Sequence, residues 1–342
     1  MKFRFLLIFI LSFSISFAQT TINQTDSKGK KQGFWKKYND KGVLLYEGNF
    51  KSDVPVGEFK YYHANGKLKS TTLFIQGVHK VYTTIYHENG VKAAEGIFID
   101  QQKDSIWNYY NDNSTLINTE SYKKGMKDGI WRTFSAQTGI LLEEENYRDD
   151  QLNGTKSSFF TNGNLNTKIE YINGKMNGAA ESYYPDKTIA SRGLYHQNSR
   201  QGNWDFYDQT GRIRKSTEYN HSRELKHYLY LYVGNNGQKV NQDLVAYFHK
   251  SGDKTVITMK NGKTFTSTDS YETAIEFLDF TDFTVVNPSY TAAYSAILKY
   301  RDIDKESIEV VLSPPTEEPV VSQGDHAMGI KMLFKTELPK ED

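Results

Sequence analysis

The chain has 342 residues, of which 37% are hydrophobic and none is cysteine. The length allows two ordinary domains, and the absence of cysteine excludes disulfides, thiolate metal sites, thiol catalysis and a lipoprotein anchor. With 42 basic and 41 acidic residues, the net charge of +1 points to neither nucleic acid nor an anionic surface as a partner. Burial must depend on the 24 tyrosines and 20 phenylalanines, whose rings suit thin β-structure.

The first 18 residues have the pattern of a signal peptide. Lys2 and Arg4 precede an apolar run over residues 5–17, and Ser16-Phe17-Ala18 places small residues where a signal peptidase reads. An uncleaved anchor is the alternative, but the run is shorter than the ~20 residues that span a bilayer. We expect cleavage after Ala18 and a soluble mature chain that is periplasmic, on the cell surface or secreted.

From residue 31 to residue 220 the sequence repeats with a period of 24 residues, with one step of 25. The heads of the eight units are Gly33, Gly57, Val81, Ser105, Gly129, Gly154, Gly178 and Gly202. Two positions later stand Trp35, Phe59, Thr83, Trp107, Trp131, Lys156, Ala180 and Trp204. Three positions further on, every residue is aromatic: Tyr38, Tyr62, Tyr86, Tyr110, Phe134, Phe159, Tyr183 and Tyr207. A fixed period of this kind indicates a repeat architecture.

Each unit has the pattern of a β-hairpin. A further column, from Phe50 to Tyr219, is aromatic in all eight units. Turn signals such as Asn65-Gly66 and Asn89-Gly90 separate the two halves of a unit, and Asn-Gly between apolar runs is a strong hairpin signal because both residues tolerate positive φ. Single hairpins are marginal in water, so we expect an elongated, twisted antiparallel array of eight hairpins. We expect each head glycine to leave room for a neighbouring ring.

At these columns the chain resembles the MORN-repeat family in its bacterial variant form, also labelled YwqK-type antitoxin-like repeats. The pattern Gly-x-Trp-x-x-Tyr is clearest in residues 202–207, and the linker pattern in residues 171–178. The resemblance covers residues 30–220. It implies protein–protein scaffolding, in some members with membrane or lipid contact. The antitoxin label implies a cytosolic partner, which an exported protein fits poorly.

After the signal peptide, the chain divides into a lead-in at residues 19–30, the repeats at 31–220 and a C-terminal part at 221–342. The sequence of the C-terminal part predicts a small α+β domain of no recognised family. Strands are expected over residues 225–233, 244–249, 255–259, 264–266, 307–312 and 328–334. The capping-box spacing at residues 269–272 predicts a short helix. Asn287-Pro288 predicts a second helix, through about Tyr300, because proline follows a good N-cap residue.

The chain shows no set of residues typical of catalysis. It has no His-Glu-x-x-His helix, Gly-x-Ser-x-Gly elbow or phosphate-binding glycine loop. His63 and His87 occupy equivalent turns, but no third metal ligand recurs with them. Residues 302–306 lack the glycine and the final glutamate of a calcium loop. We therefore expect no catalytic residue, metal or cofactor.

The aromatic columns are the candidate binding residues. Their rings either pack the sheet or form an exposed stripe suited to sugars or extended peptides. The candidates are Trp35, Tyr38, Phe59, Tyr62, Tyr86, Trp107, Tyr110, Trp131, Phe134, Tyr183, Trp204 and Tyr207. The first hypothesis is an exported, non-enzymatic protein-binding or scaffolding module of the cell envelope, with a glycan or a membrane surface as other partners. The alternatives are an unrecognised enzymatic activity in the C-terminal domain, an antitoxin or immunity role, and carbohydrate binding along the stripe.

Overall fold

The computed structural model describes residues 21–75 and 79–336. The expected signal peptide, residues 1–18, lies outside the described residues. The chain divides into two compact units, Met1–Gly139 and Ile140–Asp342, and each is described by itself. Among the described residues, no helix is long and apolar enough to cross a membrane.

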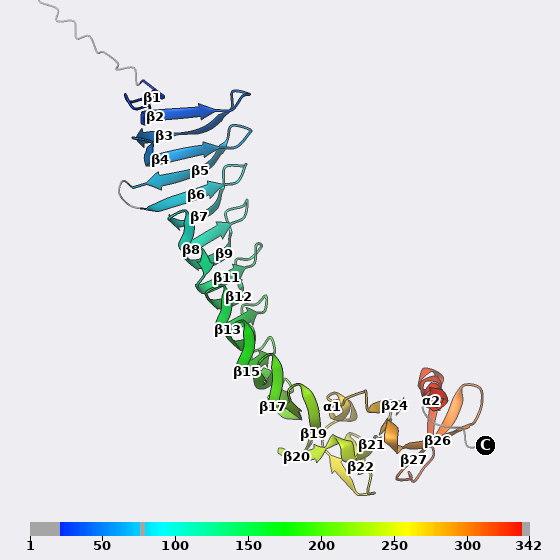
Figure 1. The fold of residues 1–342 in the computed structure, drawn as a ribbon. Helices are drawn as coiled ribbons and strands as arrows, with labels where there is room; N and C mark the ends of the chain where they lie inside the picture. The colour runs from blue at the N-terminus through cyan, green and yellow to red at the C-terminus, as the bar shows by residue number, and fades with distance from the viewer. Residues whose placement is uncertain (1–20, 76–78, 337–342) are drawn as a thin grey trace, which may run out of the picture. The chain divides into compact units, whose positions relative to one another are not determined.

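The first unit is a run of antiparallel strands in which each hairpin pairs with the next (Figure 1). Its strands are β1 (Gln24–Thr25), β2 (Lys31–Tyr38), β3 (Leu44–Lys51), β4 (Val54–Tyr62), β5 (Leu68–Phe74), β6 (Lys80–Tyr86), β7 (Lys92–Ile99), β8 (Gln102–Tyr110), β9 (Leu116–Lys123), β10 (Met126–Lys127) and β11 (Gly129–Phe134). The expected hairpins of the first four repeats are β2/β3, β4/β5, β6/β7 and β8/β9. The mainly β, hairpin-repeat fold is confirmed.

The second unit continues the pattern. Its repeat strands are β12 (Leu141–Arg148), β13 (Gln151–Phe159), β14 (Leu165–Ile172), β15 (Lys175–Tyr183), β16 (Ile189–His196), β17 (Ser199–Tyr207) and β18 (Ile213–Asn220). The ladder runs on beyond the last repeat, because β18 pairs with β19 (Arg223–Val233) and β19 with β20 (Asn236–Asn241). The C-terminal domain is therefore attached through paired strands.

The two kinds of turn differ in backbone conformation. In the described turns between repeats, two successive residues have positive φ, for example Asp100 and Gln101 at 49° and 64°. This is the type I′ geometry that matches the twist of the flanking strands. Within a repeat, only the glycine of Asn65-Gly66 is on the positive side, at 81°. The predicted hairpin is present, and its loop closes with a hydrogen bond from Gly66 N to His63 O at 2.9 Å while Asn65 keeps a negative φ.

The fully aromatic column lies where the register of each hairpin shifts. In β4/β5 the shift falls between Tyr61 and Tyr62, and Tyr62 then faces Leu68. The same shift precedes Tyr38, Tyr86, Tyr110, Phe159, Tyr183 and Tyr207. A bulge re-aims the side chain beside it, so this column has a structural reason to be uniform.

The C-terminal part of the second unit holds two small sheets and two helices. The five-stranded sheet has the order β23 (Thr264–Ser267), β22 (Lys254–Met259), β21 (Val245–Ser251), β25 (Tyr290–Ala293) and β24 (Phe283–Asn287). The three-stranded sheet consists of β26 (Ile297–Asp302), β27 (Ser307–Leu312) and β28 (Val320–Gln323). One core joins β19, both sheets and helices α1 (Tyr271–Ile275) and α2 (Gly324–Thr336), with Phe248, Ile257 and Ile308 fully buried. Two single turns, η1 (Gln242–Leu244) and η2 (Tyr294–Ala296), complete it.

The predicted helix at residues 269–278 exists as α1, with the Ser270 side chain accepting from Thr273 N. The predicted helix from Asn287 to about Tyr300 is wrong. Asn287 instead begins the turn between β24 and β25, and its Oδ1 accepts from Ser289 N at 2.8 Å. Asparagine before proline serves a turn as well as an N-cap, and the residues that follow form strand β25, which pairs with β21.

The predicted strand at residues 328–334 is also wrong, because this segment belongs to helix α2. Ala327 and Ile330 are 2% and 1% exposed, and Phe334 packs on the same core. Spacings of three and four residues bury one face of a helix. A short apolar run does not distinguish strand from helix by its composition.

Candidate functional site

The twelve predicted binding residues occupy different environments. Tyr38 is exposed, at 50%. Four others are buried: Phe59, Trp107, Trp204 and Tyr207. The remaining seven are half-buried: Trp35, Tyr62, Tyr86, Tyr110, Trp131, Phe134 and Tyr183. The structure therefore does not bring the twelve together as one open stripe.

The buried rings of the first column lie against glycine backbone. Trp107 covers Gly96, where a Cβ would fall inside the indole ring. The indole N–H donates to Ile97 O at 3.0 Å, and the ring meets Phe98 edge-on at 4.8 Å. Trp204 repeats the arrangement over Gly193, and Phe59 over Gly48. These rings pack one repeat on the next.

The expectation that the head glycines leave room for a neighbouring ring is wrong. Nothing lies within 4 Å of a Cβ placed on Gly33, Gly57 or Gly202. Their φ angles are 65°, 74° and 67°, a region that side chains disfavour. The head position needs glycine for its backbone conformation, and the close approach of a ring falls on Gly48, Gly96 and Gly193 instead.

Each tryptophan of this column carries a cation over its face. The distances from cation to ring centroid are 4.9 Å for Lys31 and Trp35, 5.0 Å for Lys103 and Trp107, 4.0 Å for Lys127 and Trp131, and 4.6 Å for Arg200 and Trp204. The cation always stands four residues before the tryptophan. In the four repeats without tryptophan this position is Pro55, His79, Leu152 or Met176. Cation and indole therefore occur together, as cation–π pairing requires.

Two tyrosines of the fully aromatic column donate hydrogen bonds to glutamates of the preceding repeat. Tyr62 donates to Glu47 Oε1 at 2.6 Å, and Tyr110 donates to Glu95 Oε1 at 2.7 Å. Burial, followed by the bond to Glu47, raises the pKa of Tyr62 to about 12. The same bond, followed by Lys36, lowers the pKa of Glu47. These pairs connect successive repeats.

The turn histidines also connect repeats. His63 Nε2 lies 3.3 Å from Tyr86 O, and His87 Nε2 lies 2.9 Å from Tyr110 O. Each imidazole thus bonds to the next hairpin.

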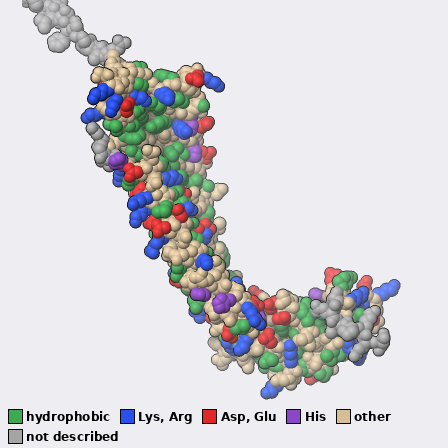
Figure 2. Space-filling model, in the orientation of Figure 1, with side chains coloured by type: hydrophobic (Ala, Val, Ile, Leu, Met, Phe, Trp, Pro, Cys, Tyr) green, Lys and Arg blue, Asp and Glu red, His purple; other side chains and the backbone are tan. Residues whose placement is uncertain are grey.

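An apolar row lies on the opposite face of the first unit. Leu73, Tyr82, Ile106 and Ile130 are 45%, 51%, 59% and 38% exposed. Leu73 pairs directly with Tyr82, and Tyr82 with Ile97. Because strand side chains alternate, this row faces away from Trp107 and Trp131. Figure 2 shows one face of the molecule, on which hydrophobic side chains gather over the first strands of this unit.

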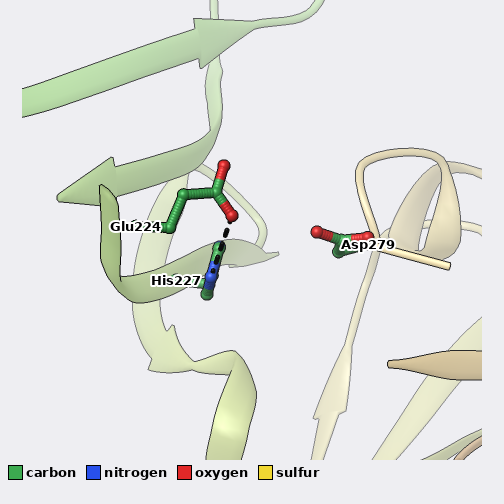
Figure 3. Close-up of side chains that lie close together, drawn as sticks. All are labelled: Glu224, His227 and Asp279. Atoms are coloured by element: carbon green, nitrogen blue, oxygen red, sulfur yellow. Dashed lines mark ion pairs between the residues drawn. The ribbon is translucent and has the colours of Figure 1, made fainter. Parts of the chain in front are cut away.

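In the second unit, Arg214 holds the last repeat to the C-terminal domain. Its side chain is 7% exposed and bonds Asp208 at 2.6 Å and Asp269 at 2.8 Å. Nearby, Glu224, His227 and Asp279 present ligand atoms within 4.8 Å of one another (Figure 3). Sequence analysis missed this group because Asp279 lies far from β19 in the sequence.

Several shallow pockets lie in the C-terminal part. One of them, about 500 Å³, is lined by Asp304, Lys305, Glu306, Ser307, Gln323 and Gly324. The Asp304 carboxylate accepts from the backbone N–H groups of Glu306 and Ser307, and Asp302 pairs with Lys331 at 2.6 Å. The segment that partly resembles a calcium loop thus uses these carboxylates for a turn and an ion pair.

Residues 55–76 and 152–173 match the model of the MORN repeat variant family. These two segments are MORN repeat variants. Each matched segment includes a glycine head and the strands on either side of a hairpin turn, so the resemblance predicted from the aromatic columns is confirmed. MORN repeats in general serve as protein- or membrane-binding modules.

No curated protein sequence matches the chain. Among solved structures, a LytTr DNA-binding domain from Bacillus cereus is 16% identical, with 31% of this chain and 95% of that chain covered and a TM-score of 0.27. TarM is 13% identical, with 28% and 20% covered and a TM-score of 0.21. The TcdB2-TccC3-Cdc42 structure is 12% identical, with 70% and 17% covered and a TM-score of 0.17. The chain spans a fifth or less of the latter two, and these low TM-scores carry no argument about function.

Proposed function

We propose that this MORN-repeat chain is an exported, non-enzymatic module that binds another protein in the cell envelope. The binding surface is the face of its first unit opposite the tryptophan column, which we call the outer face. The observation that supports this is the exposed row of Leu73, Tyr82, Ile106 and Ile130. Contiguous apolar patches on a protein surface mark interaction sites. Three of the four residues, Tyr82, Ile106 and Ile130, stand one position after a repeat head. The same position in the second unit is Thr155, Ala179 or Asn203, so only Leu194, the counterpart of Leu73, is a large apolar residue there.

The aromatic columns support a scaffold role for the repeats. Phe59, Trp107 and Trp204 are almost fully buried, and the tryptophans carry cations over their faces. A buried ring of this kind packs on the neighbouring hairpin and exposes little of its surface to a sugar. The partner surface is then on the other side of the sheet, on rigid strands that hold a binding row in place.

The test uses the mature chain as bait in a cell-envelope extract, with crosslinking and mass spectrometry. Tyr82→Ser combined with Ile106→Ser should reduce capture of the partner at least tenfold, because it removes two of the most exposed apolar side chains. Leu194→Ser is the matched control, since Leu194 is 53% exposed in the second unit. The captured protein is then titrated against the purified chain. Equal binding by the double variant, or no saturable binding, would contradict the proposal.

Export is tested separately. Fractionation of cells that express a C-terminally tagged chain, with N-terminal sequencing, should give a protein outside the cytoplasm that begins at Gln19. A cytoplasmic protein that retains residues 1–18 would contradict export and favour the antitoxin alternative.

A further inference from the structure

Three metal-binding side chains meet where the repeat sheet passes into the C-terminal domain. Glu224 and His227 come from β19, and Asp279 follows α1. One carboxylate oxygen from each acid and one imidazole nitrogen lie within 4.8 Å of one another. Figure 3 shows Glu224 and His227 paired and Asp279 beside them on a separate segment. Within the described residues, no other group of this kind is present.

Both carboxylates are held in place through hydrogen bonds. Tyr219 Oη donates to Glu224 Oε1 at 2.8 Å, and Arg200 Nη1 donates to Tyr219 Oη at 2.9 Å. Thr281 donates to Asp279 Oδ1 twice, from its backbone N at 3.0 Å and from Oγ1 at 2.8 Å. Each acid therefore has one oxygen anchored and a second oxygen for another partner. Groups that hydrogen-bond to ligating carboxylates, as Tyr219 and Thr281 do here, form the usual outer shell of a metal site.

The imidazole is held by burial and not by a hydrogen bond between its Nδ1 and any described residue. The His227 side chain is 13% exposed, its Nδ1 is sealed from solvent, and its Nε2 lies 3.4 Å from Glu224 Oε2. Two ligand atoms about 2.1 Å from a tetrahedral metal ion lie about 3.4 Å apart. The His227–Glu224 spacing is therefore that of two ligands on one ion, and Asp279 presents a third ligand atom within 4.8 Å of both.

We propose that Glu224, His227 and Asp279 bind a divalent first-row transition metal of the Zn²⁺ type. An imidazole with two carboxylates suits Zn²⁺, whereas Ca²⁺ and Mg²⁺ prefer oxygen ligands alone. The bound ion would tie the end of the repeat sheet to the segment after α1. The three protein ligands leave one position for water.

A nearby cation tunes the site. Lys215 on β18 pairs with Leu229, which lies two residues beyond His227 on the same face of β19. A positive charge near a ligand opposes a divalent cation. Replacing Lys215 by methionine should therefore tighten metal binding, an effect opposite in sign to the loss of a ligand.

The test titrates the full mature chain with Zn²⁺ by isothermal calorimetry, with Ca²⁺ and Mg²⁺ as comparison ions. We expect one Zn²⁺ per chain, at least tenfold weaker binding in Glu224→Gln and in Asp279→Asn, and tighter binding in Lys215→Met. His79→Asn is the matched control, because no third ligand among the described residues joins the His79–Asp100 pair at 3.1 Å. Circular dichroism establishes that each variant is folded.

Cobalt substitution gives a second readout. Co²⁺ bound to the wild-type chain should produce visible absorption of a four-coordinate site, and Glu224→Gln should abolish it. No Zn²⁺ binding, or binding that Glu224→Gln and Asp279→Asn leave unchanged, would overturn the proposal. Neither result bears on the outer face of the first unit, so the proposed protein-binding function is tested independently.

Discussion

The Lys103 ammonium lies 5.0 Å from the centroid of the Trp107 ring, and the same indole covers the backbone of Gly96. Trp107 is thus enclosed by a cation from its own strand and by a glycine of the preceding strand. This arrangement recurs for Arg200, Trp204 and Gly193. It assigns the tryptophan column to the cohesion of the array.

Lys103→Met should lower the free energy of unfolding by about 0.5–2 kcal/mol. It keeps the aliphatic stem and removes both the cation–π contact with Trp107 and the hydrogen bond from Lys103 Nζ to Tyr109 Oη. Urea unfolding followed by tryptophan fluorescence measures the change. Lys69→Met is the control, since Lys69 is exposed on β5 and such surface changes stay within about 0.5 kcal/mol. Equal effects of the two variants would contradict a specific role for the ammonium.

Gly96→Ala should destabilise the first unit by roughly 1–3 kcal/mol, the usual range for overpacking. The added methyl group would fall within the Trp107 ring, so the indole must move and weaken its bond to Ile97 O. Gly329→Ala gives a contrast of opposite sign. It lies inside α2 with nothing within 4 Å of the new Cβ, and should stabilise by up to about 1 kcal/mol. Thermal unfolding of both variants measures the difference, and a Gly96→Ala midpoint at or above wild type would refute it.

The Tyr62–Glu47 bond predicts opposite pH dependences at the two ends of the scale. The pKa of Glu47 is lowered in the folded state, so its contribution is present above the unfolded value of about 4.3 and is lost as pH falls through the folded pKa. The pKa of Tyr62 is raised to about 12. Its contribution is therefore complete below about pH 10 and is lost as pH rises toward 12.

Tyr62→Phe measures the alkaline effect. The stability difference between wild type and this variant should be constant from about pH 6 to pH 9 and should shrink between about pH 10 and pH 12. Denaturant unfolding at each pH provides the values. A difference that stays constant to pH 12 would mean that the phenol proton does not contribute to folding.

Arg214→Met should destabilise the second unit by about 3–5 kcal/mol, because it leaves Asp208 and Asp269 buried without their partner. Arg192→Met is the matched change. Arg192 is 58% exposed and 3.6 Å from Asp205, and exposed pairs contribute about 0–1 kcal/mol. Chemical denaturation of the two variants compares them, and similar losses would show that burial of the Arg214 network is not what matters.

The repeat architecture was predictable because packing requires the same residue type once per unit. Tyr62 and Tyr110 stand in equivalent places since each forms the same bond to a glutamate. The pairing of a cation with each tryptophan was also readable from Lys103 and Arg200, four residues before Trp107 and Trp204. Our sequence analysis compared columns singly and missed it.

The C-terminal part was harder to predict, because no second copy tests an assignment. Asn287-Pro288 suits a helix start and a turn equally, and only the pairing of β25 with β21 decides between them. The group of Glu224, His227 and Asp279 depends on contact between segments distant in sequence. Tertiary structure alone supplies that proximity.

The type I′ turns between repeats have a consequence for how such a chain can change in length. Among the described residues, a repeat contributes one complete pair of antiparallel strands and one such turn, for example Ser52 with Asp53 or Asp100 with Gln101. The chain therefore enters and leaves a repeat in the same direction along the sheet. Duplication or deletion of one 24-residue repeat would therefore leave each remaining column on its own face. Loss of a single strand would instead reverse the direction of all the strands that follow. The number of repeats can therefore change during evolution while the exposed apolar row and the tryptophan column stay on opposite faces of the sheet.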